Sequence, residues 1–287
     1  MSIVGILIVF LCVFGGFASE NHWDVSKLWQ PVELIIIGGA ALGALVISCS
    51  VPQLKAIGAA LGAVFKGKGV TKQEYVDVLM CLYEITKTGK GNMLGLEAHV
   101  ENPEASEIFK RYPALLHNHH AIHFLCDTLK IQISSPMSPY DLDDLMEQDM
   151  QAMHHEELFA PQVVARTGDA MPGLGIVAAV LGVIITMGAL KEGNEKIGEH
   201  VGAALVGTFL GVLMSYGFIQ PIAAKMEANV NEHGKILEVI KVCLLTFAKD
   251  ASPKVCIEFA RRTIPPEVRP SFKEIDDATQ NVGKKAA

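Results

Sequence analysis

The sequence predicts an all-α integral membrane protein with four transmembrane helices, a large helical domain between the second and third helix, and a C-terminal tail. Half of its 287 residues are hydrophobic and 19% are charged, a composition typical of a membrane protein with a sizeable water-exposed part. Residues 170–190 and 201–224 contain no Asp, Glu, Lys, Arg or His. With a rise of about 1.5 Å per residue, each stretch can cross the roughly 30 Å hydrocarbon core of a bilayer as a helix.

Two further apolar runs, residues 3–18 and 34–51, lie at the beginning of the chain. The first is short enough to resemble the core of a signal peptide, but no basic region precedes it and no clear cleavage site follows it. A second run begins almost at once, so we interpret the two as a transmembrane hairpin. The predicted segments are therefore a hairpin (1–51), a helical domain (52–169), a second transmembrane pair (170–224) and a helical tail (225–287).

The distribution of basic residues predicts the orientation of these segments. Residues 52–169 carry 10 Lys and Arg and residues 225–287 carry 11. The connection after the first span has only Lys27, and the connection between the third and fourth spans has Lys191 and Lys196. Cytoplasmic loops are enriched in Lys and Arg. We therefore predict that the large domain, the tail and both chain termini lie in the cytoplasm.

Several function classes find no support in the sequence. The six cysteines are scattered without a CxxC pair, which argues against a disulfide framework or a zinc knuckle. His119 and His123 are spaced as zinc ligands can be, but no Cys or carboxylate completes a set, so we expect no metal and no other cofactor. Residues 52–169 hold 16 acidic against 10 basic residues, which argues against nucleic-acid binding. No phosphate-binding loop or nucleophile motif is present, so we expect no enzyme.

Apolar residues in the segment 52–169 recur at helical spacing. Two stripes carry this pattern: Val76, Leu79, Met80 and Tyr83, and then Ile122, Leu125 and Leu129. Thr71 followed by Glu74 predicts a capping box at a helix start, and Ser138 predicts a second helix start with Asp141 in its first turn. Prolines at 103, 113, 136 and 139 predict breaks. This domain should be all-helical.

The third and fourth spans carry a line of small and hydroxyl residues, namely Thr186, Gly207, Thr208 and Ser215. A lipid-facing anchor needs none of these, whereas a helix pair packed closely around a polar object would use them. No carboxylate lies deep in these spans, and a protein that moves protons needs a titratable group at membrane depth. If the chain conducts protons, the proton carrier must come from another polypeptide, and this chain forms the wall of the channel.

Three residues at the ends of apolar runs each have two interpretations. Glu33, near the outer end of the second span, is either an interfacial carboxylate or a residue near an ion entrance. Pro172 and Pro221 each remove a backbone hydrogen bond. They either end helices or form joints that link membrane events to the water-exposed domain.

Seven short stretches of the chain carry a family resemblance. They are 30–34 (QPVEL), 101–103 (ENP), 175–180 (GIVAAV), 206–211 (VGTFLG), 216–221 (YGFIQP), 255–262 (VCIEFARR) and 269–272 (RPSF). Each motif is weak alone, but together they are very specific. In these stretches the chain resembles the MotA family of flagellar stator subunits, and the likeness runs nearly from end to end, including the order of the spans and the loop lengths.

The resemblance implies a torque generator of bacterial motility in the inner membrane. MotA-like chains form a ring around the single spans of a MotB-like partner, which supplies the ion-carrying aspartate and anchors the complex to peptidoglycan. Ion flow makes the ring act on the rotor protein FliG through charged residues of the cytoplasmic domain. Under this resemblance, residues 52–169 are the rotor-interaction domain and residues 170–224 line the channel, with the proton as coupling ion.

The resemblance also assigns roles to individual residues. Pro172, Pro221 and Thr208 match family positions tied to ion flow and its coupling to movement, and Thr186 belongs to the same channel line. Sodium-driven relatives carry a threonine where this chain has Ala179, and an alanine methyl cannot coordinate Na⁺, which favours protons.

The resemblance further identifies charged residues that face the rotor. Glu97 matches the acidic residue of the family that does so. The position of its basic counterpart is Gly89, so Lys90 or Lys87 would take over that charge.

Three alternatives remain at this point. The nearest is an ExbB/TolQ-type energiser, which shares the two-span proton-channel core but acts on a periplasmic partner. Those chains have one span before the cytoplasmic domain, whereas this sequence predicts a hairpin there. A solitary channel or transporter would need polar residues inside its own spans. A cytoplasmic enzyme with a membrane anchor is the most distant alternative.

Overall fold

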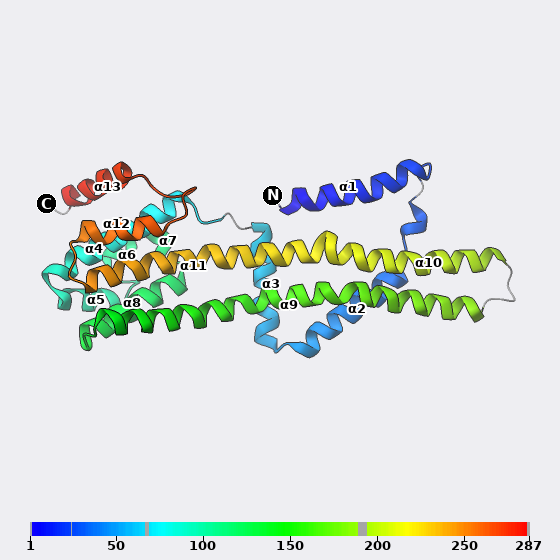
Figure 1. The fold of residues 1–287 in the computed structure, drawn as a ribbon, viewed down its shortest axis with the longest axis horizontal. Helices are drawn as coiled ribbons and strands as arrows, with labels where there is room; N and C mark the ends of the chain where they lie inside the picture. Colours follow the sequence, from blue (N-terminus) through cyan, green and yellow to red (C-terminus); the bar gives the residue numbers. More distant parts are fainter. Residues whose placement is uncertain (1, 24, 67–68, 189–193, 286–287) are drawn as a thin grey trace. The chain divides into compact units, whose positions relative to one another are not determined.

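The computed structural model describes residues 2–23, 25–66, 69–188 and 194–285, and these residues form helices without a strand (Figure 1). The helices before the longest one are α1 (Ser2–Glu20), α2 (Pro31–Ser48), α3 (Val51–Lys66), α4 (Lys72–Gly91), α5 (Glu97–Glu101), α6 (Glu107–Lys110), α7 (Pro113–Leu116) and α8 (His119–Ser134). Then follow α9 (Pro139–Gly188), α10 (Asn194–Val212), α11 (Gln220–Ala248), α12 (Pro253–Thr263) and α13 (Phe272–Lys285). A π-helical segment, η3 (Leu213–Ile219), joins α10 to α11, and two short 3₁₀ turns are η1 (Ser26–Leu28) and η2 (Met93–Leu96).

In the part of the chain that the structure describes, four helices are long and apolar enough to cross a membrane, as the sequence predicts. They are α1, α2, α9 and the continuous helix His200–Ala248, which combines most of α10 with η3 and α11. The transmembrane hairpin, the large helical region between the second and third spans and the absence of strands in the described residues confirm the predicted fold class.

The chain divides into two compact units. The membrane unit comprises residues 1–67 and 157–229, and the globular unit comprises residues 68–156 and 230–287. Helices α9 and α11 contribute residues to both units, because each continues through a unit boundary.

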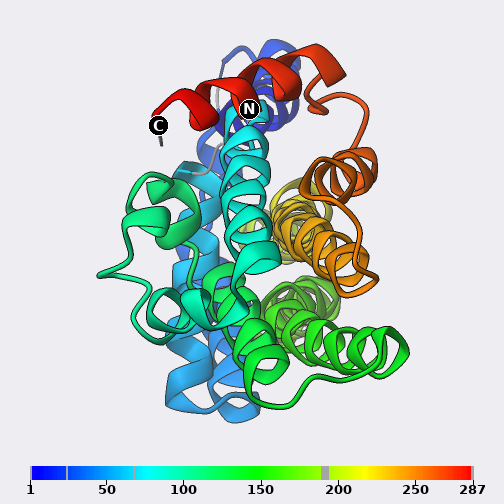
Figure 2. The same cartoon turned by 90° about the vertical axis from the view of Figure 1, so that its left-hand side faces the viewer.

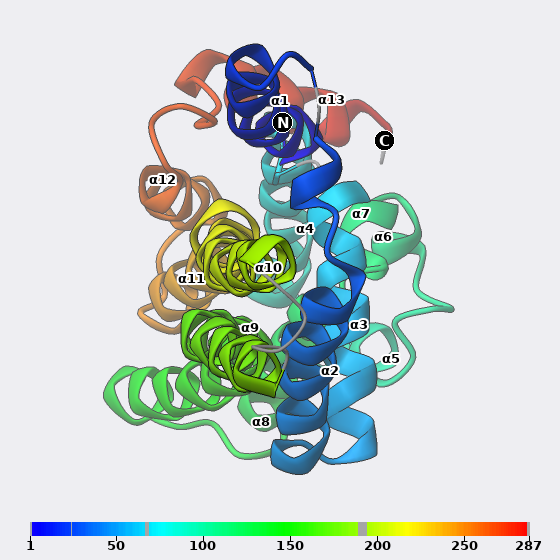
Figure 3. The same ribbon diagram turned by 90° about the vertical axis from the view of Figure 1, so that its right-hand side faces the viewer.

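The membrane unit has two small buried clusters and leaves many apolar side chains exposed on its surface. One buried cluster joins α2 to the helix pair α9–α10 and contains Ile37, Ala41, Met171, Ala178 and Leu210. Figure 3 shows α2 lying beside α9 and α10. A second cluster packs α3 against α9 and α11. Outward-facing residues such as Ile35, 72% exposed, would contact lipid, so this exposed surface is what a bilayer requires.

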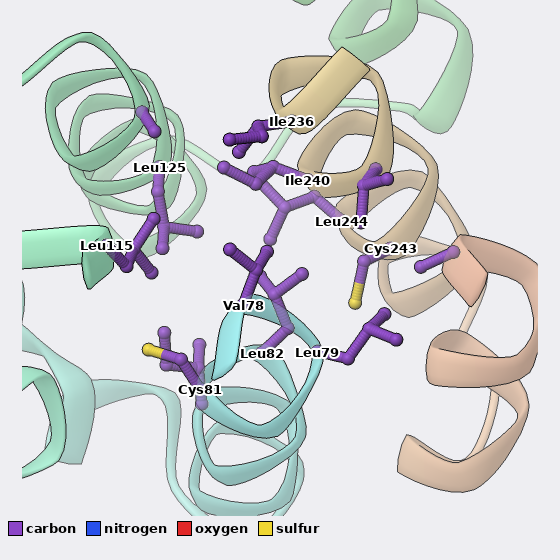
Figure 4. Close-up of a cluster of buried hydrophobic side chains, with 14 of the residues drawn as sticks. Val78, Leu79, Cys81, Leu82, Leu115, Leu125, Ile236, Ile240, Cys243 and Leu244 are labelled. Carbon is purple, nitrogen blue, oxygen red and sulfur yellow. The ribbon is translucent and has the colours of Figure 1, made fainter. Parts of the chain in front are cut away.

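The globular unit is built around α4. In Figure 2, α4 lies between α11 and α12 on one side and the short helices α6 and α7 on the other. Its core is a single cluster of large apolar side chains, of which Leu79, Leu82, Leu125, Ile240 and Cys243 are shown in Figure 4. Both predicted apolar stripes contribute to this core, because Leu79, Met80, Ile122, Leu125 and Leu129 are buried, while Val76 and Tyr83 pack against it.

Polar contacts fix the helix ends in this unit. Thr71 and Glu74 form the predicted capping box, in which the Thr71 amide donates to Glu74 Oε2 (2.6 Å) and the Glu74 amide to Thr71 Oγ1 (3.3 Å). Ser138 caps α9 by accepting from the amide of Asp141 (3.2 Å). Both predicted helix starts are confirmed.

A buried carboxylate connects α4 with the segment that follows α6. Glu84 accepts hydrogen bonds from Arg111 Nη1 (2.7 Å) and from the Tyr112 hydroxyl (2.6 Å). Burial, together with the hydrogen bond to Glu84, raises the pKa of Tyr112 well above its usual value. The network satisfies a charge that burial alone would strongly disfavour.

Candidate functional site

Helices α9 and α10 touch through their backbones. A methyl group placed on Gly211 would lie 2.6 Å from the carbonyl oxygen of Met171, and one placed on Gly175 would lie 2.9 Å from the carbonyl oxygen of Gly207. No side chain larger than hydrogen fits at either position without moving a backbone. Gly207 and Gly211 are four residues apart on one face of α10, the small-residue spacing that lets membrane helices approach closely.

The close contact continues along the pair. A methyl group on Gly182 of α9 would lie 3.0 Å from Cβ of Ala204 on α10. Gly175 and Gly182 are two helical turns apart, so the contact extends over about 10 Å. The sequence prediction of a closely packed helix pair is therefore confirmed, and the pair is called the α9–α10 wall below.

A carboxyl group lies against this wall. Glu33 in the first turn of α2 is 9% exposed, and its Oε2 atom is buried without a hydrogen-bond partner among the described residues. A methyl group on Gly207 would lie 3.3 Å from Glu33 Cγ and 3.4 Å from Cβ of Ala178. Glu33 therefore reaches α10 at the level of Ala178 and Ala179. Its place in the first turn of α2 is compatible with both interpretations from the sequence, but its side chain packs against α10 and does not extend into the surroundings.

The hydroxyl groups of the predicted channel line have different surroundings. Thr186 is buried and donates to the carbonyl of Gly182 in its own helix (2.8 Å). Ser215 is completely buried, and its Oγ finds no partner in the part of the chain that the structure describes. Thr208 is half-buried beside Gly207, and Ala179 is half-buried on α9. The structure thus places Ala179 and Thr208 along the α9–α10 contact, while Thr186 lies further along α9.

The two prolines do not end helices. Pro172 lies inside α9, as does Pro161, and Pro221 is the second residue of α11. The interpretation as helix ends is therefore wrong, since α9 continues beyond Pro172 to Gly188 and a continuous helix runs through Pro221 to Ala248. Just before Pro221 the backbone widens into the π-helical η3, which accommodates the proline ring without breaking the helix.

A polar contact beside the prolines was not predicted. The side-chain amide of Gln220 donates to the carbonyl of Ala165 (3.2 Å) and to the carboxylate of Asp169. Gln220 precedes Pro221, and Asp169 lies three residues before Pro172, so this contact joins the two helices at their proline positions. Its position next to Pro221 and its place in the stretch 216–221 (YGFIQP) are the signals in the sequence that could have drawn attention to Gln220.

The two residues expected to face the rotor, Glu97 and Lys90, lie in the globular unit. Only Lys90 makes polar contacts within the described residues. Glu97 is the exposed first residue of α5, and no hydrogen bond or ion pair in the described structure involves its carboxylate. The ammonium of Lys90 donates to the carbonyls of Asp250 (3.1 Å) and Ala251 (3.2 Å) and pairs with the Asp250 carboxylate (3.7 Å). Lys90 therefore stabilises the turn after α11, where Asp250 has a positive φ of 60°.

Lys87 differs from Lys90 in its contacts. It is exposed one turn earlier on α4 and has no partner within the described residues. Gly89 is buried, and a methyl group there would lie 2.8 Å from Leu96 Cδ1 and 3.0 Å from Phe247 Cζ. A basic side chain at position 89 would collide with the core, whereas Lys87 and Lys90 on the same helix are both exposed. Among the described residues, no three His, Cys, Asp or Glu side chains lie together as a metal site would require.

Two stretches of the chain match known protein families. Residues 117–238 match the MotA/TolQ/ExbB proton channel family, which defines the class of this protein, and residues 3–92 match the motility protein A N-terminal family. The chain is 34% identical to motility protein A of Salmonella typhimurium over 98% of its own length and 95% of that protein, and equally similar to the Escherichia coli protein. It therefore belongs to the motility protein A family.

Other relatives agree with this assignment. The chemotaxis protein LafT of Vibrio parahaemolyticus is 34% identical over 95% of this chain and 96% of that protein. The fold resembles a chain in the structure of Campylobacter jejuni MotAB with a TM-score of 0.75 and 20% identity, covering 94% of this chain and 98% of that one. The flagellar MotAB stator complex from Bacillus subtilis gives 0.73 and 22%, covering 94% and 97%. The two structural matches show that the chain shares the fold of these proteins.

Proposed function

We propose that this chain is a stator subunit of the flagellar motor that forms a proton channel with a MotB-like partner and converts proton flow into torque. The supporting observation is the backbone contact of α9 and α10 at Gly175, Gly207 and Gly211 in a chain of this family. Such a contact gives a closely packed helix pair that can serve as the wall of a channel.

The partner requirement follows from the residues of the wall. Residues 170–188 and 201–224 contain no ionisable group except the phenol of Tyr216, which is exposed. A MotB-like single-span subunit, anchored to peptidoglycan, would bring the aspartate that carries the proton. Several copies of this chain would surround it as a ring.

The proposed location is the bacterial inner membrane with both termini in the cytoplasm. The 21 Lys and Arg of residues 52–169 and 225–287, against three in the two outer connections, support this orientation. In this orientation the globular unit, which holds Glu97 and Lys87, faces the cytoplasm and the rotor.

The test is complementation in a host that lacks its own stator. Expressed with a MotB-like partner, the chain should restore swimming that stops when a protonophore collapses the proton gradient and that continues without sodium. Swimming whose speed follows external Na⁺ at constant pH would contradict the choice of ion. The variant Ala179→Thr tests the residue behind that choice, because a hydroxyl there can contribute to Na⁺ coordination.

The rotor contact is proposed to use Glu97 and Lys87 against charged residues of FliG. Exposed ion pairs contribute only about 0.2–1 kcal/mol each, so neutralising Glu97→Gln should be tolerated better than reversal in Glu97→Lys, which adds repulsion. Reversal at both Glu97 and Lys87 should impair swimming most, while the complex still assembles. Opposite charge changes on FliG should restore swimming. Normal swimming of the double reversal at high load would exclude these residues from the rotor contact.

Lys90→Glu serves as the contrast to Lys87→Glu. Lys90 stabilises the turn after α11, so its reversal should lower the stability of the globular unit, and no change on FliG should rescue it. Rescue of Lys90→Glu by FliG would instead assign the rotor role to Lys90.

A further inference from the structure

The membrane unit has a groove that the proposed channel does not use. It lies between the C-terminal half of α2 and the part of α9 that precedes the uncharged stretch, and its volume is about 270 Å³. Apolar side chains, including Leu45, Phe159 and Val163, form most of its lining. The polar lining groups are Ser48, Arg166 and Thr167.

Arg166 is the polar lining group that is free to bind a ligand. The hydroxyl of Ser48 donates to the carbonyl of Leu45 (3.0 Å), and that of Thr167 donates to the carbonyl of Val163 (2.9 Å), each within its own helix. Arg166 is exposed and has no hydrogen bond or ion pair within the described residues. The carboxylate three residues further along α9, Asp169, is occupied by Gln220. The guanidinium therefore presents five N–H donors to the surroundings.

The groove lies where a bilayer changes from hydrocarbon to headgroups. Ser48 is the last residue of the membrane-spanning helix α2, and Arg166 is four residues before the uncharged stretch of α9 begins at position 170. Arginine at such a boundary extends its charged end toward the headgroups while its stem lies along apolar surface. The apolar wall from Ala41 to Ser48 runs for about 10 Å into the hydrocarbon region.

We infer that this groove binds one anionic phospholipid, with its phosphate on Arg166 and the first part of an acyl chain along the apolar wall. A planar guanidinium can bind phosphate through two parallel hydrogen bonds. A zwitterionic headgroup carries the same phosphate together with a cation, and the groove lining contains no carboxylate to receive that cation. The lining therefore favours a lipid with net negative charge, such as phosphatidylglycerol.

The test is native mass spectrometry of the full chain in mild detergent, titrated with phosphatidylglycerol, with phosphatidylcholine or with inorganic phosphate. One phosphatidylglycerol should remain bound per chain, and Arg166→Gln should weaken its binding about tenfold. Ala44→Leu, which fills the groove, should have a similar effect. The matched controls Lys55→Gln and Ala40→Leu change an exposed lysine and an exposed alanine outside the lining, and they should bind as the unmodified chain does.

Three results would overturn the inference. Equal retention of phosphatidylcholine would mean that the groove does not select charge. Binding of inorganic phosphate as tight as that of phosphatidylglycerol would mean that the apolar wall contributes nothing. Unchanged phosphatidylglycerol binding by Arg166→Gln, with loss of the higher oligomer, would mean that Arg166 pairs with an acidic residue of a neighbouring chain. None of these outcomes depends on whether the complex conducts protons.

Discussion

The membrane unit and the globular unit are both helical, but they hold their helices together in different ways. In the membrane unit, α9 and α10 meet at Gly175, Gly207 and Gly211, where backbone touches backbone. In the globular unit, α4 is surrounded by large side chains such as Leu79, which is 0% exposed, and Phe124. Helices α9 and α10 thus meet at positions without side chains, whereas α4 is held by large apolar side chains that pack around it.

The outer surfaces of the two units also differ, because the membrane unit exposes apolar side chains and the globular unit exposes charged ones. Ile35 and Leu205 of the membrane unit are exposed, whereas the surface of the globular unit carries ion pairs such as Lys72–Glu274 and Lys254–Asp276. The difference follows from the solvent. Lipid offers no hydrophobic driving force between helices, so close van der Waals contact at small residues must supply the attraction. Water offers that force, so burying large apolar side chains is sufficient.

The largest expected effect comes from adding a side chain to the helix contact. In Gly211→Val the new Cβ would lie 2.6 Å from the Met171 carbonyl oxygen, so α9 and α10 must separate. Swimming should be abolished, as measured in soft agar with the protein level checked by immunoblotting. The control Gly202→Val lies on the same helix, where nothing is within 4 Å of the added Cβ, and it should keep most of its motility. Equal behaviour of the two variants would show that the glycine contact is dispensable.

The next largest effect tests how much a large buried side chain stabilises the globular unit. Leu79→Ala empties a completely buried site in the globular unit and should reduce the free energy of unfolding by about 2–5 kcal/mol. Ile35→Ala truncates a side chain of similar size that is 72% exposed on the membrane unit, and it should change stability by less than about 1 kcal/mol. Thermal unfolding of both variants in detergent measures the difference. A larger loss for Ile35→Ala would mean that this surface contacts protein rather than lipid.

A smaller effect is expected from the buried carboxylate of the globular unit. Glu84→Gln removes the charge that receives hydrogen bonds from Arg111 and Tyr112, and the change should cost about 1–3 kcal/mol. Glu104→Gln, at an exposed position of the same unit, provides the control and should be neutral. A neutral result for Glu84→Gln would show that the network does not stabilise the fold.

The smallest effect is pH-dependent. Two hydrogen bonds from Arg261, supported by a third one from Arg262, lower the pKa of Glu258 from its usual value of 4.5 to about 2. A lowered pKa means that the stabilisation is fully present above about pH 4.5 and is lost as the pH falls toward 2. Glu258→Gln should therefore be less stable than the unmodified chain by about 1–2 kcal/mol at neutral pH. The difference should shrink below pH 4.5, and a constant difference at all pH values would contradict this account.

Local patterns in the sequence were sufficient to predict much of the fold. The capping residues Thr71 and Ser138 marked two helix starts because a cap acts within three residues. The stripe through Leu79 marked the core face of α4, because helical periodicity is a local property. The small residues of the third and fourth spans, such as Gly207, predicted their close contact, because small side chains let membrane helices approach closely.

The contacts missed by the sequence analysis all join residues far apart in the chain. Lys90 binds carbonyls 160 and 161 positions later, and Gln220 reaches a carbonyl 55 positions earlier. Glu33 is buried because α2 packs on Gly207 of α10, which no spacing within α2 could indicate. Both prolines lie within helices, whereas a local rule predicts a break at each of them.

The central claim is that this chain forms the wall of a proton path and that a partner supplies the proton carrier. The most direct measurement is cytoplasmic acidification under an imposed proton gradient, in cells that express the chain alone or together with a MotB-like partner. The account predicts acidification only when both proteins are present, and its loss in the pair when the partner's membrane aspartate is replaced by asparagine. Acidification by this chain alone would contradict the account.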